Sequence, residues 1–247
     1  MYHEQTHHPI HTTAHCTAAL ELFDAVPLYP CHELEDCLTK EGLYHRLETG
    51  IRWETHPWRD SHIGAGVLVC LTNAGQVGLE WKNWYFDWYY EHTDPETGFP
   101  FFGAVKKAPL YEYMAGGFHY FFNHEAEHRP MRYPEKVIDS CLQLMKSTDG
   151  PFMKHCGFIE IDVVYCLTRA MRQSPHRFHE AKAALDDFAV EFFDMMLHLD
   201  YEGDRLFNDL HSLFGSVCCM AELQSALPGK IISSKPLRLV LDRRPFI

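Results

Sequence analysis

Apolar side chains recur along this chain with a helical period, and the period ends repeatedly at a turn. Trp81, Trp84 and Trp88 have helical spacing, which is typical of an amphipathic helix with an aromatic face. The stretch from Asp94 to Phe99 follows, and its Pro and Gly residues predict a tight turn that stops the helix. We expect Phe99 to return to the interior after this turn.

The same order of helix, turn and aromatic residue occurs again in residues 135–152 and 188–207. Helix-like stretches also begin at intervals of roughly 50 residues, which is the spacing of repeated supersecondary units. They begin near His11, Arg59, Leu110, Phe158 and Asp209. Two of them share the pattern C-L-T-x-A, at 70–74 and 166–170. No alternation of period two persists, so the chain is predicted to be all-α.

Repeated helical hairpins predict either an open solenoid or a ring of inner helices enclosed by outer ones. We therefore expect a partial or closed α/α toroid, formed by a single domain over residues 1–247. Residues 1–10 are expected to be a flexible lead, and residues 228–247 a C-terminal strap. The expected helices are 11–25, 32–50 with a break at Gly42, 59–74, 81–92, 110–127, 135–146, 158–172, 177–197 and 209–227.

Composition narrows the functional classes. The chain has 247 residues, is 46% hydrophobic and 23% charged, and has a formal net charge of -12. An acidic chain is a poor ligand for nucleic acid or an anionic membrane surface. No apolar stretch is long enough to span a bilayer, and no signal peptide is recognisable. The nine cysteines include no C-x-x-C pair, which favours reduced thiols in a cytoplasmic protein.

The helix-turn repeat resembles that of terpenoid cyclases and protein prenyltransferases, the α/α-toroid superfamily. The residues that carry the resemblance are Lys82, Trp84, Asp94, Gly98, Phe99, Asp149, Gly150 and Phe152. The catalytic motifs depart from that family. Residues 160–163 (EIDV) lack the last acid of D-x-D-D, and Asp139-Ser140-Cys141 falls in an expected outer helix. Glycan hydrolases, lyases and epimerases also use α/α barrels. The resemblance therefore implies an architecture, and either an isoprenoid-like or a carbohydrate substrate.

In such a ring the first turns of the inner helices gather around one mouth. The catalytic candidates there are Asp162, Glu160, His62 and His211. The substrate-binding candidates are Trp58, Arg59, Asp60, Tyr111, Glu112, Phe102, Phe158 and Asp209. Carboxylates in a first turn also stabilise a helix by capping it and by opposing its dipole, and this alternative applies most directly to Asp60 and Asp209.

Asp162 and His62 are the sharpest candidates because each is set in an apolar context. Asp162 stands between Ile161 and Val163. A carboxyl buried there must be paired or protonated, because burial of a bare charge is unfavourable. A raised pKa would suit a general acid. His62 precedes Ile63 and is the equivalent case for an imidazole.

Two histidine patterns suggest metal chemistry. Residues 124–128 (HEAEH) fit H-E-x-x-H, which on a helix places His124 and His128 on one face for zinc. Pro130 follows at once, however, and no sheet is expected beside the motif. The histidine-rich start could bind a transition metal or form a flexible surface segment. It contains His3, His7, His8, His11 and His15.

The leading hypothesis is an enzyme with a central acid/base pocket. Its expected substrate is an isoprenoid-like molecule or a carbohydrate, and its expected reaction is of cyclase or isomerase, lyase or hydrolase type. The alternatives are a non-catalytic helical scaffold that binds a ligand and an H-E-x-x-H zinc peptidase. No cofactor is predicted, although a divalent metal is possible, and an open ring could close as a homodimer.

Overall fold

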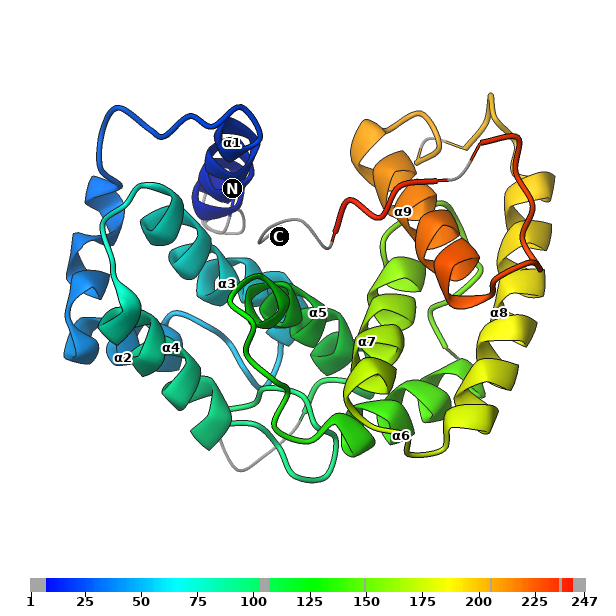
Figure 1. Ribbon diagram of the computed structural model, residues 1–247, viewed down its shortest axis with the longest axis horizontal. Helices are drawn as coiled ribbons and strands as arrows, with labels where there is room; N and C mark the ends of the chain where they lie inside the picture. The colour runs from blue at the N-terminus through cyan, green and yellow to red at the C-terminus, as the bar shows by residue number, and fades with distance from the viewer. Residues whose placement is uncertain (1–7, 103–106, 149, 205, 236, 242–247) are drawn as a thin grey trace. The chain divides into compact units, whose positions relative to one another are not determined.

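The computed structural model describes residues 8–102, 107–148, 150–204, 206–235 and 237–241, and every named element in those ranges is a helix. The all-α prediction is therefore confirmed. The elements are α1 (His8–Glu21), the 3-10 helix η2 (His32–Leu38), α2 (Lys40–Thr49), α3 (Pro57–Asn73), α4 (Leu79–Glu91), α5 (Leu110–Ala126), α6 (Pro134–Met145), α7 (Ile159–Gln173), α8 (Phe178–His198) and α9 (Leu210–Ala226) (Figure 1).

Most predicted helix ends lie within two residues of the structure, but two predicted helices depart further. The first helix lies earlier than expected, so that residues 8–10 of the expected flexible lead belong to α1. The expected break at Gly42 is wrong, because Gly42 lies inside α2 and the chain breaks at Thr39. Thr39 has an extended backbone, and its Oγ1 accepts a hydrogen bond from the Gly42 N–H at 3.2 Å. This is an N-cap, which starts a new helix rather than interrupting an old one.

The chain forms two compact units, which are described separately. The described residues of unit 1 lie within Met1–Asp94 and Phe99–Arg132, and those of unit 2 lie within Pro95–Gly98 and Tyr133–Leu241. The single domain over 1–247 and the closure of its hairpins into a ring both stay predictions.

Unit 1 has two layers of helices. In one layer α3 packs against both α1 and α5, while α2 packs against α4 and η2. The aromatic face of α4 joins the layers, since Trp81 and Trp88 are buried and the Tyr85 hydroxyl donates to the Gly64 carbonyl of α3 at 3.0 Å. The aromatic stripe is therefore core packing.

The turn after α4 has the predicted form. Gly98 has a φ of +80°, a left-handed conformation that favours glycine. The Asp94 N–H donates to the Phe99 carbonyl at 3.0 Å. Phe99 is completely buried against Gly117 of α5, where an added Cβ would lie 2.6 Å from the Phe99 ring. The return of this aromatic side chain to the interior is confirmed.

In unit 2, α7 packs against α6, α8 and α9. The described part of the C-terminal strap contains no helix or strand and is held to α9 by Gln224. The Gln224 side chain donates to the Ser233 hydroxyl at 2.9 Å and accepts from the Leu237 N–H at 2.9 Å. The side-chain amide of Gln224 therefore holds the strap at two positions, Ser233 and Leu237.

We predict that Gly64→Ala destabilises unit 1 by about 1–3 kcal/mol, the usual effect of overpacking a close-packed core. The added Cβ would lie 2.7 Å from the Tyr89 hydroxyl, 2.8 Å from Ile51 Cδ1 and 2.9 Å from the Tyr120 hydroxyl. Urea unfolding followed by tryptophan fluorescence measures this effect, because all five tryptophans belong to unit 1.

Gly78→Ala is the matched control, since its backbone is extended and nothing lies within 4 Å of an added Cβ. Equal unfolding midpoints for the two variants would show that the interface around Gly64 has room for a methyl group.

Candidate functional site

The first turns of α7 and α9 adjoin in unit 2. Gly215 of α9 faces the chain just before α7, and an added Cβ would lie 2.8 Å from both the Gly157 carbonyl and the Phe158 ring. The Cys156 thiol lies 3.1 Å from the Ser216 hydroxyl of α9. The chain that leads into α7 thus packs against the N-terminal part of α9, while the gathering of all the first turns around one mouth stays a prediction.

His211 lies at this junction. Its ring stacks on Phe158 with a centroid separation of 4.3 Å and an interplanar angle of 30°. The residue is exposed, but partial desolvation of the ring lowers the pKa of His211, although the charge of Asp209 opposes the shift. The imidazole is therefore mainly neutral at pH 7.

Glu160 and Asp162, here called the acid pair, lie in the first turn of α7 and are completely buried. Glu160 Oε1 accepts a hydrogen bond from the Met153 N–H at 2.8 Å. Neither carboxyl oxygen of Asp162 has a hydrogen-bond partner within the described part of the chain. The sequence prediction that Asp162 is buried among apolar side chains is thus correct, and nothing described pairs with it.

The acid pair retains protons at unusually high pH. Burial raises the pKa of Glu160 to about 7. Burial, and then the charge of Glu160, raise the pKa of Asp162 well above its ordinary value. Desolvation dominates both shifts because removing water disfavours the charged carboxylate.

Other acidic groups surround the same junction. The charges of Asp204, Glu160 and Asp209 all reach the Cys156 thiol and, together with burial, raise its pKa. Asp209 itself caps α9, since its Oδ2 accepts from the Ser212 N–H at 3.0 Å and from the Ser212 hydroxyl at 2.8 Å. The capping alternative therefore accounts for Asp209.

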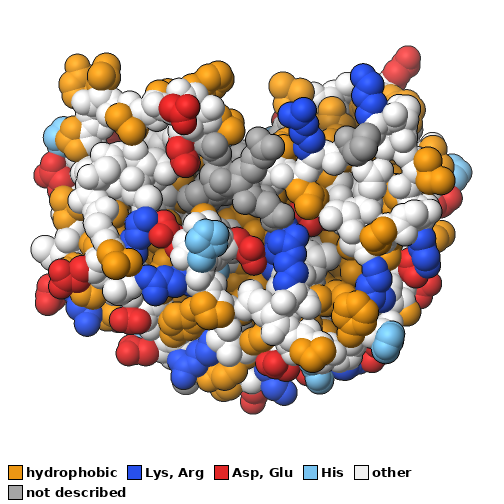
Figure 2. All heavy atoms as spheres, viewed as in Figure 1, with side chains coloured by type: hydrophobic (Ala, Val, Ile, Leu, Met, Phe, Trp, Pro, Cys, Tyr) orange, Lys and Arg blue, Asp and Glu red, His pale blue; other side chains and the backbone are white. Residues whose placement is uncertain are grey.

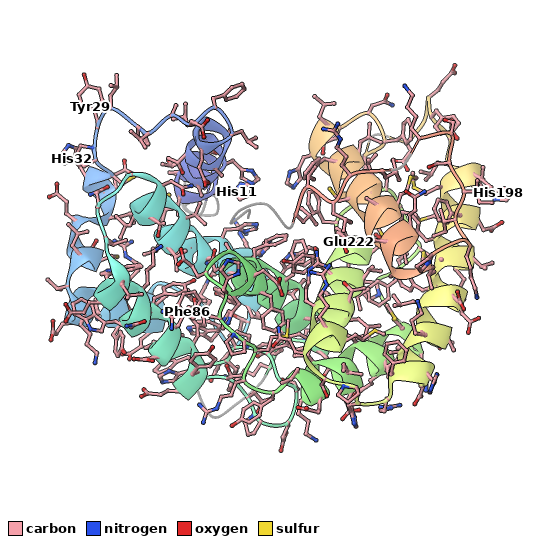
Figure 3. The ribbon with its side chains drawn as sticks, viewed as in Figure 1. His11, Tyr29, His32, Phe86, His198 and Glu222 are labelled. Atoms are coloured by element: carbon pink, nitrogen blue, oxygen red, sulfur yellow. The ribbon has the colours of Figure 1, made fainter. Side chains whose placement is uncertain are left out.

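A buried ion pair lies farther along the same two helices, and sequence reasoning missed it. Arg169 of α7 donates to both carboxylate oxygens of Glu222 of α9, each at 2.8 Å. Glu222 is labelled in Figure 3. Arg169 is 0% exposed and Glu222 is 2% exposed. The sequence did contain a signal for this ion pair, namely a charged residue inside an apolar helical run. The same signal identified Asp162.

The remaining candidates belong to unit 1 and have local partners. Asp60 accepts from the Arg52 N–H and from its guanidinium, at 2.9 and 2.7 Å, and this pairing holds the Asp60 pKa low despite its burial. The Glu112 carboxylate accepts from the backbone N–H of Trp58, although burial raises its pKa overall. Arg59, Tyr111 and Phe102 are half-buried. The hydrogen bonds of Asp60 and Glu112 therefore stabilise the backbone at and before the first turn of α3.

His62 belongs to a series of four rings in unit 1, here called the histidine row: His15, His11, His62 and His119. Consecutive ring centroids along the row are 4.4 Å apart. His119 is buried in the apolar middle of α5 and was missed from the sequence. The expected meeting of His62 with Asp162 stays a prediction, since the two residues belong to separate units.

The H-E-x-x-H stretch does not form one helical face. His124 is buried in the last turn of α5, where burial lowers its pKa to about 4. His128 follows the end of the helix with a φ of +53°. Among the described residues, no group of three or more His, Cys, Asp or Glu side chains is arranged to hold a metal ion.

Comparisons with known proteins add no homologue: no family model matches the chain, and neither does any curated protein or solved structure. Within the described residues, no helix has both the length and the apolar character needed to cross a membrane. On the face drawn in Figure 2, acidic and basic side chains are interspersed among the described residues.

The acid pair predicts a specific pH dependence of stability. Because the folded pKa of Glu160 is raised from 4.5 to about 7, folded chains hold a proton that unfolded chains release within this range. The associated stability is complete below about pH 4.5 and is lost as the pH rises towards 7, by at most about 1.4 kcal/mol per pH unit for one proton.

We predict that Glu160→Gln combined with Asp162→Asn flattens this decline, measured as urea midpoints by circular dichroism at pH 5 and pH 7. Exposed Glu191 on α8 provides the control Glu191→Gln. An unchanged slope in the double variant would mean that the acid pair is ionised, or solvated, in the folded protein.

Proposed function

We propose that this protein is an enzyme that performs acid–base chemistry at the first turns of α7 and α9. Glu160 is the proposed proton donor and His211 the proposed proton acceptor. The support is the opposition of their pKa shifts: burial raises the pKa of Glu160 to about 7, while desolvation lowers that of His211. Groups whose environments push their pKa values in opposite directions are a pattern found where acid and base roles are divided.

Asp162 has a separate role in this proposal. The charge of Glu160 adds to the effect of burial and raises the pKa of Asp162, because two neighbouring carboxylates resist ionising together. Both carboxyls therefore hold their protons to higher pH than ordinary carboxyls do. His62 has no part in this proposal, since it belongs to unit 1.

A neutral carbohydrate is the substrate class that suits these surroundings. The negative charges of Asp204 and Asp209 reach Cys156, and the chain carries a net charge of -12. Both features disfavour the diphosphate of an isoprenoid substrate. The exposed ring of His211 on Phe158 offers an aromatic surface. The α/α-barrel resemblance supports the same class, since glycan hydrolases, lyases and epimerases share that architecture.

In the proposed reaction, the Glu160 proton passes to the oxygen of the breaking bond. His211 accepts a proton from water or from a sugar carbon. Glu160 is completely buried, and the Met153 N–H holds its carboxyl. Substrate entry therefore requires the turn of residues 151–157 to move away from the first turn of α7.

A non-catalytic scaffold is the second candidate, and specific contacts favour it. Asp209 is satisfied as a helix cap, and Asp60 is satisfied by Arg52. A scaffold explains such locally paired groups without any reaction. It does not explain Asp162, whose oxygens have no hydrogen-bond partner in the described part of the chain.

We predict that Glu160→Gln and His211→Gln each reduce turnover by about 100- to 10,000-fold, the usual contribution of a positioned general acid or base. The assay screens wild-type protein on neutral oligosaccharides and, as the competing class, on isoprenoid diphosphates. Exposed Asp187 on the outer helix α8 provides the control Asp187→Asn, which should retain full activity.

The pH profile gives a second readout. Activity needs neutral His211 and protonated Glu160, so the acidic limb should lie below 6.5 and the alkaline limb near 7. Turnover of oligosaccharides that is equal in wild type and Glu160→Gln would remove Glu160 as the acid. Absence of turnover on both classes, together with tight binding of a ligand, would favour the scaffold.

A further inference from the structure

Two imidazoles face each other one helical turn apart on α1. His11 (labelled in Figure 3) and His15 are both half-buried, and their Nε2 atoms are 3.0 Å apart. Residues four apart on a helix lie on the same face. In the neutral pair, one Nε2 donates its proton to the lone pair of the other.

This spacing is close to that of two nitrogen ligands on one metal ion. With zinc–nitrogen bonds of about 2.0–2.1 Å, two nitrogens of a tetrahedral site lie about 3.3 Å apart. A small rotation of the His11 and His15 side chains would move their Nε2 atoms far enough apart. A metal ion could then bind between them in place of the shared proton. The required movement is within the rotational freedom of half-buried side chains.

The rest of the histidine row orients this pair. The His62 ring packs edge-on against His11, with a centroid separation of 4.4 Å, and its Nδ1 donates to the Arg59 carbonyl at 2.9 Å. That bond fixes the tautomer and places the His62 lone pair on Nε2.

His119 is fixed in a similar way. The Ser61 hydroxyl donates to the Trp58 carbonyl, so the contact of 2.7 Å between Ser61 Oγ and His119 Nδ1 uses the His119 proton. Hydrogen bonds at Nδ1 therefore fix the two rings that lie behind His11 in the row.

We propose that His11 and His15 form a two-imidazole clamp for a divalent transition metal ion of borderline softness, such as Zn²⁺ or Ni²⁺. Imidazole prefers these ions to Mg²⁺ or Ca²⁺. No third side chain is already converged on the ion among the described residues, so water or a small ligand occupies its other positions. The clamp is independent of the proposed acid–base chemistry, because its residues lie in unit 1.

The test is calorimetric titration of the full-length, tag-free and metal-free protein with ZnCl₂, and with MgCl₂ as the hard-cation comparison. Wild type should bind Zn²⁺ and not Mg²⁺. His11→Ala and His15→Ala should each weaken Zn²⁺ binding on the order of tenfold or more. His198 on α8 is exposed, so His198→Ala is the matched control and should bind like wild type.

A second variant separates the clamp from the histidines that precede it. His3→Ala/His7→Ala/His8→Ala should keep the wild-type affinity. Circular dichroism confirms that each variant folds, and His15→Gln replaces His15→Ala if that protein is unfolded. Binding of Cu²⁺ should show a two-nitrogen signature in electron paramagnetic resonance. Loss of binding in the triple variant, or unchanged binding in both His11→Ala and His15→Ala, would overturn the proposal.

Discussion

The interface between α7 and α9 is governed by the burial of ionisable side chains. Along α7 this burial has two different outcomes: an ion pair at one position and raised pKa values at another. Arg169 and Glu222 are buried together, and two hydrogen bonds of 2.8 Å compensate both charges. Glu160 and Asp162 are buried as deeply, but no described cation is paired with them. Their pKa values rise instead, because a protonated carboxyl is far easier to bury than a carboxylate.

Unit 1 also buries neutral polar groups between its helices. The Tyr85 hydroxyl donates to the Gly64 carbonyl, and the Asn123 side chain donates to Tyr85 at 2.9 Å and to the Ala65 carbonyl at 3.1 Å. Trp81 Nε1 donates to the Cys37 carbonyl at 2.7 Å. These neutral donors satisfy backbone carbonyls of neighbouring helices. The histidine row belongs to the same class of contact, since its anchors are the Arg59 carbonyl and the Ser61 hydroxyl.

The helices could be predicted because they are encoded locally. Periodic apolar positions and the Pro and Gly residues of the turns predicted every long helix, and Phe99 returned to the core as expected. The expected break at Gly42 was wrong because the helix start is set by a side-chain bond, the Thr39 cap, which outweighs the low helix propensity of Gly42. The apolar context of Asp162 revealed its burial, since that context lies within the same helix.

Partners were harder to predict because they are distant in the sequence. Arg169 pairs with Glu222, 53 residues away, and His119 contacts Ser61, 58 residues away. Neither pairing follows from periodicity, which gives the face of a helix but not the residue opposite it. Asp60 and Asp209 proved to have local partners: Ser212 accounts for Asp209 as a helix cap, whereas Asp60 pairs with Arg52 and is not the N-cap of α3.

The acid pair is the feature that a purely structural explanation accounts for least well. Caps and salt bridges stabilise the elements that contain them, whereas Glu160 and Asp162 weaken the folded state as the pH rises, because unfolding lets them ionise. An apolar side chain or a neutral amide in place of Glu160 would avoid this loss of stability. Groups that break a local rule without compensation tend to occur at functional sites. His211 on the adjacent first turn has the opposite shift, which is why the proposed reaction assigns the acid role to Glu160 and the base role to His211.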